Sequence, residues 1–385
     1  MNFKESFLRR FDWILFLSAF ILSIIGLVAI YSTDLAKSAS DFANFKKQAM
    51  TFLLGLFALF IAAIFNYRQL RNGKNILYLF GFLLLSAVLI FGRTIRGTTG
   101  WFIFGPLTFQ PVELVKIILV IFLAEYFSRE GRNLFSFLDI FKSLVSALIF
   151  IVLVLMQPDF GSAIILFLIW LGMLLASRIQ KKHLIIFASI FLISLGALSY
   201  FVFFQNEEKC FKISGQTSCA IAPLKEYQKE RIKVFINPDL DPLGSGYNIK
   251  QAMIAIGSGG FWGKGLGFGS QSQLRFLPET HTDFIFALIA EEMGFFITAL
   301  VLGLFALLFF RVLSIAKNSA DNFTAYLSIG FLIVFVSETL INIGMNLGLM
   351  PVTGLALPFI SLGGSSLLSK FLMVGILESI RLRSA

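Results

Sequence analysis

Long apolar segments, separated by short polar turns, run through most of this chain. Several reach the ~20 residues that an α-helix needs to cross a bilayer. Charged residues make up only 14% of the sequence and hydrophobic residues 57%, whereas soluble chains carry roughly 25% charged residues. We therefore predict an all-α polytopic membrane protein with ten transmembrane helices. The predicted spans are residues 12–31, 49–66, 74–92, 112–127, 136–156, 160–177, 184–204, 283–310, 322–344 and 354–378.

The net charge of +10 is distributed by side of the membrane, which argues for a lipid surface and against nucleic acid as the partner. With a cytoplasmic N-terminus, fifteen basic residues fall on the cytoplasmic side and five in the short outer loops. Because cytoplasmic loops of membrane proteins are enriched in Lys and Arg, this asymmetry predicts an N-in and C-in topology. The localisation that follows is a multi-pass protein of a cytoplasmic membrane.

The longest polar segment, residues 205–282, is predicted to be an extracytoplasmic loop between spans seven and eight, within one integral domain covering residues 1–385. Its glycine-rich part is not a phosphate-binding loop, because its Gly-Lys pair is followed by Gly instead of Ser or Thr. Both cysteines of the chain, Cys210 and Cys219, lie in this loop. Two interpretations stay open: a disulfide formed on an oxidising face, or two free thiols.

Ionisable residues inside predicted spans are the first functional candidates, because such residues are rare in membranes and usually face a cavity or a partner. In the fourth span, Glu113 and Lys116 are three residues apart and so share one helical face. They are either a mutually neutralising pair that specifies packing or the polar lining of a substrate site.

The start of the eighth span combines Glu279, His281 and Asp283 with a strongly apolar continuation. At helical spacing, Asp283 lies above a strip of small residues, which suggests close helix packing or the floor of a groove. An alternative role for Asp283 is a helix N-terminal carboxylate favoured by the helix dipole. Thr280 or Thr282 is expected to cap this helix, and Glu292 is a candidate to pair with a basic residue elsewhere.

Further polar groups gather at the same predicted membrane depth on the outer side. Asp159 lies in the short turn MQPDFGSA, where it either stabilises the turn or faces a site. Lys370 and Glu338 lie within the last two spans, and the Pro/Gly-interrupted segment 348–366 includes Ser365 between them. Irregular backbone at membrane depth occurs only where it is buried or lines a wet cavity. These residues predict one site open to the extracytoplasmic side.

With these residues in view, the chain resembles the SEDS family (shape, elongation, division and sporulation), which includes RodA and FtsW of bacterial cell-wall synthesis. The motifs are GWFIFGPLTFQPVELVK (100–116), QPDFGSA (157–163), the segment 254–292 and PVTGLALPFISLGGSS (351–366). The similarity extends from Trp13 to about Glu378. The Gly-Lys-Gly at 263–265 and the QSQLRFLPE run look more like RodA than FtsW.

The resemblance implies a peptidoglycan glycosyltransferase that polymerises lipid II, a disaccharide-peptide on undecaprenyl pyrophosphate, in a bacterial cytoplasmic membrane. It also implies a class B penicillin-binding protein, a transpeptidase, as partner. The essential aspartate of the family falls on Asp283, its conserved tryptophan on Trp101, and its polar pair on Glu113 and Lys116. Two departures stand out: the run GTTGW has no basic residue before Trp101, and Val112 replaces the usual Ser.

For this reaction we predict Asp283 as the general base that takes a proton from a sugar hydroxyl. No cofactor is required by the sequence, and a divalent metal, Mg²⁺ or Mn²⁺, held by Asp283 with pyrophosphate is an open alternative. The predicted substrate-binding residues are Trp101, Glu113, Lys116, Asp159, Lys264, Glu279, His281, Thr282, Ser365 and Lys370. Two other functions stay open: a flippase for lipid-linked precursor and a scaffold that recruits a transpeptidase.

Overall fold

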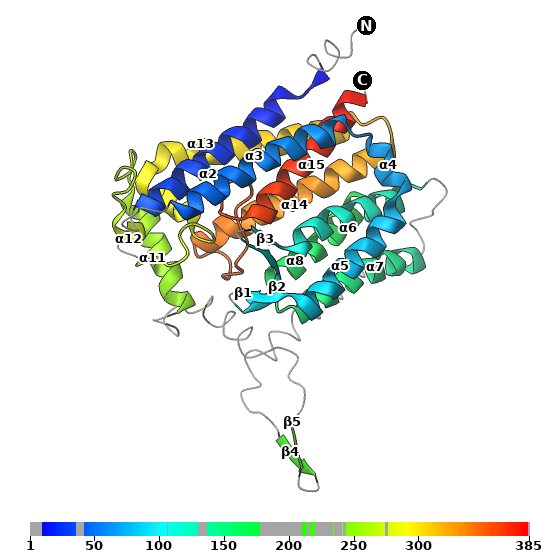
Figure 1. Cartoon of the computed structure of the whole chain (residues 1–385), viewed down its shortest axis with the longest axis horizontal. Coiled ribbons are helices and arrows are strands. Elements are labelled where there is room, and N and C mark those ends of the chain that lie inside the picture. Colours follow the sequence, from blue (N-terminus) through cyan, green and yellow to red (C-terminus); the bar gives the residue numbers. More distant parts are fainter. Residues whose placement is uncertain are drawn as a thin grey trace.

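Long helices lie side by side in one bundle, as a computed structural model of the chain shows (Figure 1). The structure describes residues 10–35, 42–95, 97–105, 107–129, 137–177, 210–213, 216–219, 234, 241, 244–273 and 276–383. The long helices are α2 (Trp13–Leu35), α3 (Ala43–Ile64), α5 (Lys74–Phe91), α6 (Pro111–Ser128), α7 (Phe137–Met156), α8 (Phe160–Ala176), α13 (Ile285–Lys317), α14 (Asn322–Asn346) and α15 (Gly364–Arg383). Shorter helices are α4 (Tyr67–Asn72), α11 (Ser245–Ser258) and α12 (Ser270–Gln273).

Nine of the ten predicted spans overlap one of these long helices, and the predicted span 184–204 lies outside the described residues. Six of the described helices are long and apolar enough to cross a membrane: α2, α3, α5, α7, α13 and α14. The apolar α8 is shorter, and α6 and α15 carry charged side chains within their length. The chain is therefore a mostly helical, multi-pass membrane protein.

A small antiparallel sheet, absent from the all-α prediction, follows α5. Its strands are β1 (Arg93–Ile95), β2 (Thr98–Phe104) and β3 (Leu107–Phe109), in the order β1-β2-β3. Gly97 and Gly105 lie in the two turns with φ of 81° and 60°, a left-handed conformation that only glycine adopts at little cost. The two turns reverse the chain twice within residues 93–109, and the segment therefore pairs with itself as three strands.

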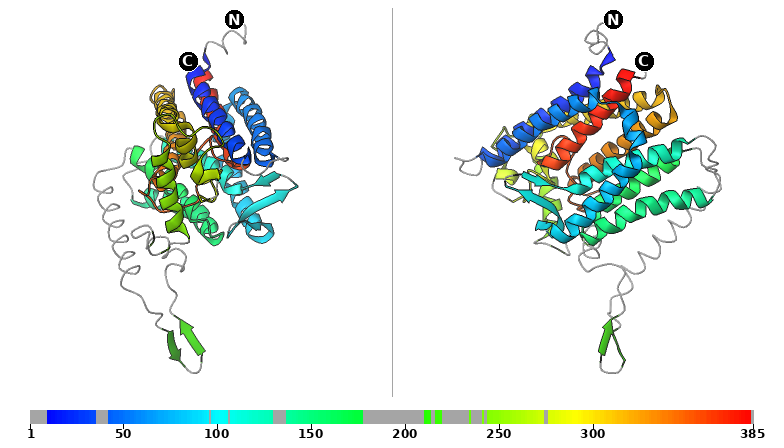
Figure 2. Two further views of the ribbon diagram at one scale, coloured as in Figure 1. Left: turned by 90° about the vertical axis from the view of Figure 1, so that its left-hand side faces the viewer. Right: turned by 45° about the vertical axis from the view of Figure 1, so that its right-hand side comes forward.

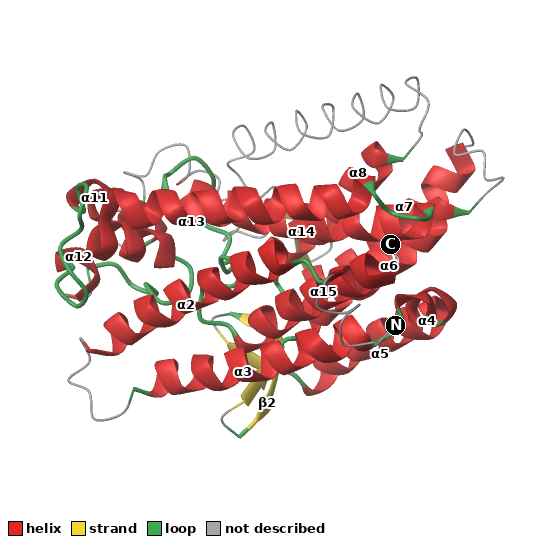
Figure 3. Ribbon diagram, turned by 90° about the horizontal axis from the view of Figure 1, so that it is seen from above, coloured by secondary structure: helices red, strands yellow, loops and turns green. Residues whose placement is uncertain are grey.

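The tenth predicted span begins later than expected. Residues 351–363 are not helical, and α15 starts at Gly364 instead of residue 354. The segment is apolar enough to be included in a predicted span, but its glycines and prolines prevent a regular helix. Helix α15 then packs along α3 (Figure 3), where a Cβ on Gly375 would lie 2.4 Å from the carbonyl oxygen of Leu59. Small residues at such a crossing let two membrane helices approach closely.

Helix α13 is interrupted at Gly294, whose φ of 75° is not helical. The glycine-rich loop before α12 fills the break: the amides of Lys264 and Gly265 donate to the carbonyls of Glu291 and Glu292 at 3.0 and 2.9 Å. In return, the amide of Phe295 donates to the carbonyl of Gly260 at 2.9 Å. The backbone groups that the break releases are thereby satisfied within the protein, as a membrane environment requires.

Two side-chain expectations for α13 are wrong. Helix α13 begins after Phe284 without a capping side chain of its own, and Thr282 instead donates its hydroxyl to Glu279. Within the described ranges, Glu292 has no ion pair with a basic residue, and its carboxylate instead accepts from the hydroxyl of Ser32 on α2 and from Gln273. Short polar side chains are therefore the partners of Glu292.

Both ends of the described chain meet at one end of the bundle (Figure 2). There the amide of Asp12 donates to the buried carboxylate of Glu378 at 2.9 Å, and the guanidinium of Arg311 bonds Asp12. The sheet β1–β3 lies toward the opposite end (Figure 1). In the loop 205–282, strands β4 (Cys210–Ile213) and β5 (Gln216–Cys219) pair with Cys210 opposite Cys219, and a disulfide between them stays a prediction.

Candidate active site

A cavity of about 230 Å³ lies where the sheet, the start of α6, the turn before α8, the turn before α13 and the segment 351–366 converge. Six of the predicted site residues line it: Trp101, Glu113, Asp159, Thr282, Asp283 and Ser365. They are far apart in the sequence and come from five separate elements. The structure thus brings these six residues together around one cavity.

Asp283 is half-buried and lies in the turn that precedes α13. The turn is organised by the carbonyl of Glu279, which accepts from the amides of Thr282, Asp283 and Phe284 at 3.2 to 3.3 Å. On the other side of the cavity, Gly354 has a φ of 75°, and a Cβ there would lie 3.7 Å from Oδ2 of Asp283. The carboxylate therefore faces the backbone of the irregular segment 351–363.

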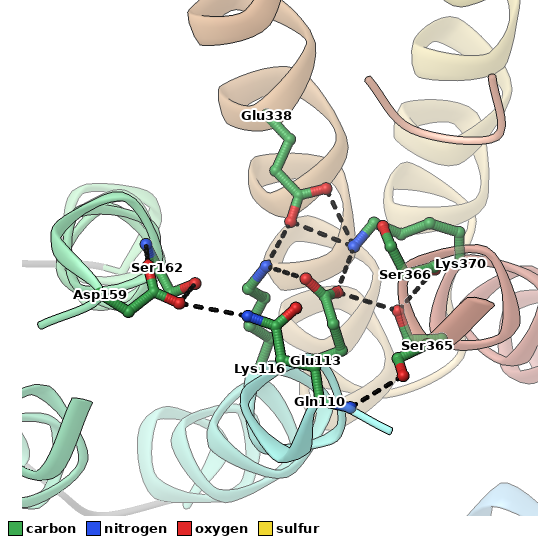
Figure 4. A network of polar contacts seen from close by, with 10 residues as sticks. Gln110, Glu113, Lys116, Asp159, Ser162, Glu338, Ser365, Ser366 and Lys370 are labelled. Atoms are coloured by element: carbon green, nitrogen blue, oxygen red, sulfur yellow. Dashed lines mark hydrogen bonds and ion pairs between the residues drawn. The ribbon is translucent and has the colours of Figure 1, made fainter. Parts of the chain in front are cut away.

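Asp159 has a structural role as well as a place in the cavity. Its Oδ1 accepts from the amide of Ser162 at 2.9 Å, which makes it the N-cap of α8. Its Oδ2 accepts from the Ser162 hydroxyl at 2.7 Å and from the Gln110 amide group at 3.2 Å (Figure 4). Gln110 in turn donates its backbone N–H to Ser365 at 2.8 Å. These contacts link α6, α8 and the start of α15 around the cavity.

Beneath the cavity lies a buried quartet of two acids and two lysines (Figure 4). Lys116 bonds Glu113 and Glu338 at 2.7 Å each, and Lys370 bonds the same two carboxylates at 2.8 and 3.1 Å. Both lysines are 0% exposed, and only Glu113 reaches the cavity surface. The four charges cancel. Lys116 and Lys370 are therefore bound to carboxylates and do not line the cavity. Their prediction as substrate-binding residues does not match these positions.

The cavity is acidic and rich in hydroxyl groups. Among the described residues that line it, three are carboxylates and none is lysine or arginine. Two aromatic residues, Trp101 and Phe160, form part of the wall. Such a lining suits an uncharged, hydroxylated ligand better than a phosphate group, because hydroxyls can donate to carboxylates whereas like charges repel.

Residues 12–385 match the FtsW/RodA/SpoVE family of cell cycle proteins. The chain belongs to this family. A relative named probable peptidoglycan glycosyltransferase FtsW, from Geobacter sp. (strain M18), is 32% identical over 380 residues, which cover 97% of each chain. Peptidoglycan glycosyltransferase RodA of Treponema pallidum is 30% identical and covers 97% of this chain and 98% of its own. The SEDS resemblance is thereby confirmed, while the similar identities to FtsW and RodA do not separate these two branches.

A solved structure is also similar to this FtsW/RodA/SpoVE family member. It belongs to a peptidoglycan synthase complex that coordinates polymerization and crosslinking, with a TM-score of 0.77 and 29% identity. The match covers 96% of this chain and 97% of that one. The helical fold described above is therefore shared over nearly the full length.

Besides the two buried lysines, three further predicted site residues of this family member do not line the cavity. Lys264, predicted to bind substrate, bonds Glu291 at 2.9 Å. The reason is local, because Glu291 is fully buried and its carboxylate also accepts from the amides of Gln271 and Ser272. Glu279 and His281 flank the turn, with 3.9 Å between their Oε2 and Nε2 atoms, and neither is among the lining residues.

Several site residues were missed by reasoning from sequence. Gln110, Ser162, Thr353 and Ser366 also line the cavity. Each is a neutral polar residue close to a predicted motif, so hydropathy alone gives it no weight. A usable signal was present for Gln110: it precedes the proline at the start of α6, and a residue before proline is restricted to extended backbone.

Proposed function

We propose that this chain is a peptidoglycan glycosyltransferase that polymerises lipid II at the outer face of a bacterial cytoplasmic membrane, with Asp283 as general base. The observation that carries the proposal is the position of Asp283. Its carboxylate lines a polar cavity that also contains Trp101, at the point where α13 enters the apolar bundle. The names of the FtsW and RodA relatives support the same reaction class.

In the proposed step, a hydroxyl of the acceptor sugar attacks the anomeric carbon of the lipid-linked donor. The new C–O bond forms as the bond from that carbon to the pyrophosphate oxygen breaks, and its electron pair leaves with pyrophosphate. The hydroxyl proton passes to Asp283. A single displacement of this kind converts an α-linked donor into a β-linked product and needs only one base.

The cavity accommodates the sugar and not the whole substrate. Its volume of about 230 Å³ is below the roughly 300–1,000 Å³ typical of pockets for drug-sized ligands. Trp101 offers an aromatic face for the sugar ring, and Asp159, Glu113 and the serine and threonine hydroxyls offer hydrogen bonds. The polyprenyl tail then extends along the lipid-facing helices, and the pyrophosphate lies outside the acidic wall.

A divalent metal ion would require donors from the substrate. In the described ranges, no three His, Cys, Asp or Glu side chains gather closely enough to hold one. Mg²⁺ or Mn²⁺ bound at Asp283 would therefore share its coordination with the pyrophosphate oxygens and would neutralise charge on the leaving group. The proton transfer described above does not depend on it.

The proposed topology has ten transmembrane helices with both termini in the cytoplasm and the loop 205–282 outside. It is supported by the meeting of Asp12 and Glu378 at one end of the bundle. We also propose a class B penicillin-binding transpeptidase as partner, since the similar solved structure belongs to a complex that coordinates polymerization and crosslinking.

Polymerisation by the purified chain in detergent, with its transpeptidase partner, tests the proposal against the flippase alternative. Detergent micelles have no second leaflet, so a flippase gives no product there, whereas a glycosyltransferase converts lipid II to glycan strands. Glycan strands on a gel are expected. A preparation that moves lipid II across vesicles but makes no strands would overturn the proposal.

A further inference from the structure

Two asparagines near the outer end of α14 converge on the backbone of Asp283. Asn342 and Asn346 are one helical turn apart, and both are fully buried. The Nδ2 group of Asn342 donates to the carbonyl oxygen of Asp283 at 3.1 Å, and that of Asn346 donates to the same oxygen at 3.0 Å. Two donors occupy both lone pairs of this one carbonyl.

Each asparagine also holds a second element. Asn342 donates to the carbonyl of Leu355 at 2.7 Å, in the irregular segment whose Gly354 faces the Asp283 carboxylate. The Oδ1 of Asn346 accepts from the amide of Ala287 at 3.2 Å. That amide belongs to the first turn of α13, which has no capping side chain of its own. Asn346 therefore acts as the cap from a neighbouring helix.

The carbonyls before Asp283 are held in the same way. The carbonyl of His281 accepts from the amide of Leu362 at 2.9 Å, and that of Thr282 accepts from the hydroxyl of Ser361 at 2.6 Å. Three successive carbonyls of the turn, from His281 to Asp283, are thus fixed by four different donors. The backbone of Asp283 cannot rotate without breaking buried hydrogen bonds, each of which costs about 1–3 kcal/mol to leave unmade.

We propose that Asn342 and Asn346 are positioning residues for the Asp283 carboxylate, acting through its backbone carbonyl. The inference rests on the proposed function, because it assigns the pair a role in the same reaction. Asn342 fixes the distance between Asp283 and the segment around Gly354, and Asn346 fixes the start of α13 below it. Neither residue lines the cavity. A shift of about 1 Å in a catalytic group costs on the order of 100-fold in rate.

The test uses the full-length chain and initial rates of lipid II polymerisation. Asn342→Leu removes both donations of that residue at similar size. Asn346→Asp keeps an oxygen for the amide of Ala287 and loses the donor to Asp283, so it separates positioning from capping. Thr339→Val is the matched control, because Thr339 lies on the same helix and its buried hydroxyl has no hydrogen-bond partner in the described structure. All variants are assayed at a temperature where their helical signal equals that of wild type.

We expect kcat to fall about 10- to 100-fold in Asn342→Leu and Asn346→Asp, with KM for lipid II nearly unchanged. Added to Asp283→Glu, in which the carboxylate is already displaced by one methylene, Asn342→Leu should cause little further loss, since both changes act on one geometry. Asn342→Leu turning over as fast as Thr339→Val would overturn the inference. So would a loss that multiplies fully with that of Asp283→Glu.

The role of Asp283 and the role of the two asparagines can be disproved separately. If Asp283→Asn polymerises lipid II at the wild-type rate, the proposed function of Asp283 is wrong whatever the asparagines do. If Asp283→Asn is inactive while both asparagine variants match Thr339→Val, the positioning role alone is wrong.

Discussion

Oε2 of Glu113 lies 2.8 Å from Nζ of Lys370, joining the start of α6 to α15 inside the bundle. The contact closes a buried quartet with Lys116 and Glu338 in which each lysine lies between two carboxylates. Because the charges cancel, the quartet can persist at membrane depth, and because only Glu113 reaches the cavity, it supports the site from below. Removing one member of the quartet leaves an uncompensated charge in a buried site.

Lys370→Met should therefore destabilise the protein strongly, by about 3–5 kcal/mol, as expected for a buried ion pair that loses one partner. The double variant Glu338→Gln/Lys370→Met removes one charge of each sign and should be more stable than Lys370→Met alone. Thermal unfolding of the purified proteins in one detergent measures both. A double variant less stable than the single one would show that charge balance is not what the quartet provides.

The break in α13 depends on glycine. A Cβ on Gly294 would lie 2.3 Å from the backbone nitrogen of Gly263, and Gly294 has a φ of 75°. We expect Gly294→Ala to loosen the contact between α13 and the glycine-rich loop and to lower the unfolding temperature. Gly303→Ala on the same helix is the control: nothing lies within 4 Å of its Cβ, so it should be neutral or stabilising by up to about 1 kcal/mol. Equal effects of the two substitutions would contradict this account.

Lys264 should matter less for catalysis than its motif suggests. It bonds Glu291, which is fully buried, so Lys264→Met should lower stability by about 1–3 kcal/mol. The amides of Gln271 and Ser272, which also donate to Glu291, limit the loss. Polymerisation should continue at close to the wild-type rate, since Lys264 does not line the cavity. Steady-state rates over a range of lipid II concentrations test whether Lys264 contributes to catalysis. A large loss of kcat in Lys264→Met would indicate that Lys264 contacts the substrate.

Trp101 should act on binding more than on chemistry. Trp101→Ala removes the indole from the cavity wall and leaves Phe160 in place. It should raise KM for lipid II, by about tenfold if it loses about 1.4 kcal/mol of stacking. Trp101→Phe keeps a ring and should retain most of the affinity. If instead kcat falls in Trp101→Ala while KM stays constant, Trp101 has a role in the transition state that ring stacking does not explain.

The parts of the fold that follow from hydropathy could be predicted, and the parts that depend on backbone hydrogen bonding could not. Apolar runs locate the helices, and scarce charges in them point to Asp283 and Glu113. Hydropathy does not register the turns at Gly97 and Gly105 that create the sheet, or the break at Gly294. The hydrogen bonds from Asn342 and Asn346 to the carbonyl of Asp283 could not be predicted, because they join residues far apart in the sequence. The sequence shows only two amide side chains one turn apart in an apolar span.

The pairing of charges was likewise open from sequence alone. Glu113 and Lys116 do pair, but the pair is completed by Lys370 and Glu338 from helices more than 200 residues away along the chain. Lys264 was assigned to the substrate because a basic residue in a polar outer loop suits a phosphate. Its true partner, Glu291, lies within an apolar helix, where sequence gives no sign of which residue it meets.

The most direct test of the central claim compares Asp283→Asn with wild type in two measurements on the same preparation: lipid II binding and lipid II polymerisation. Because asparagine keeps the size of the side chain but does not act as a base, binding should persist while the polymerisation rate falls by about 10²- to 10⁴-fold. Polymerisation at the wild-type rate would contradict the assignment of Asp283 as the general base.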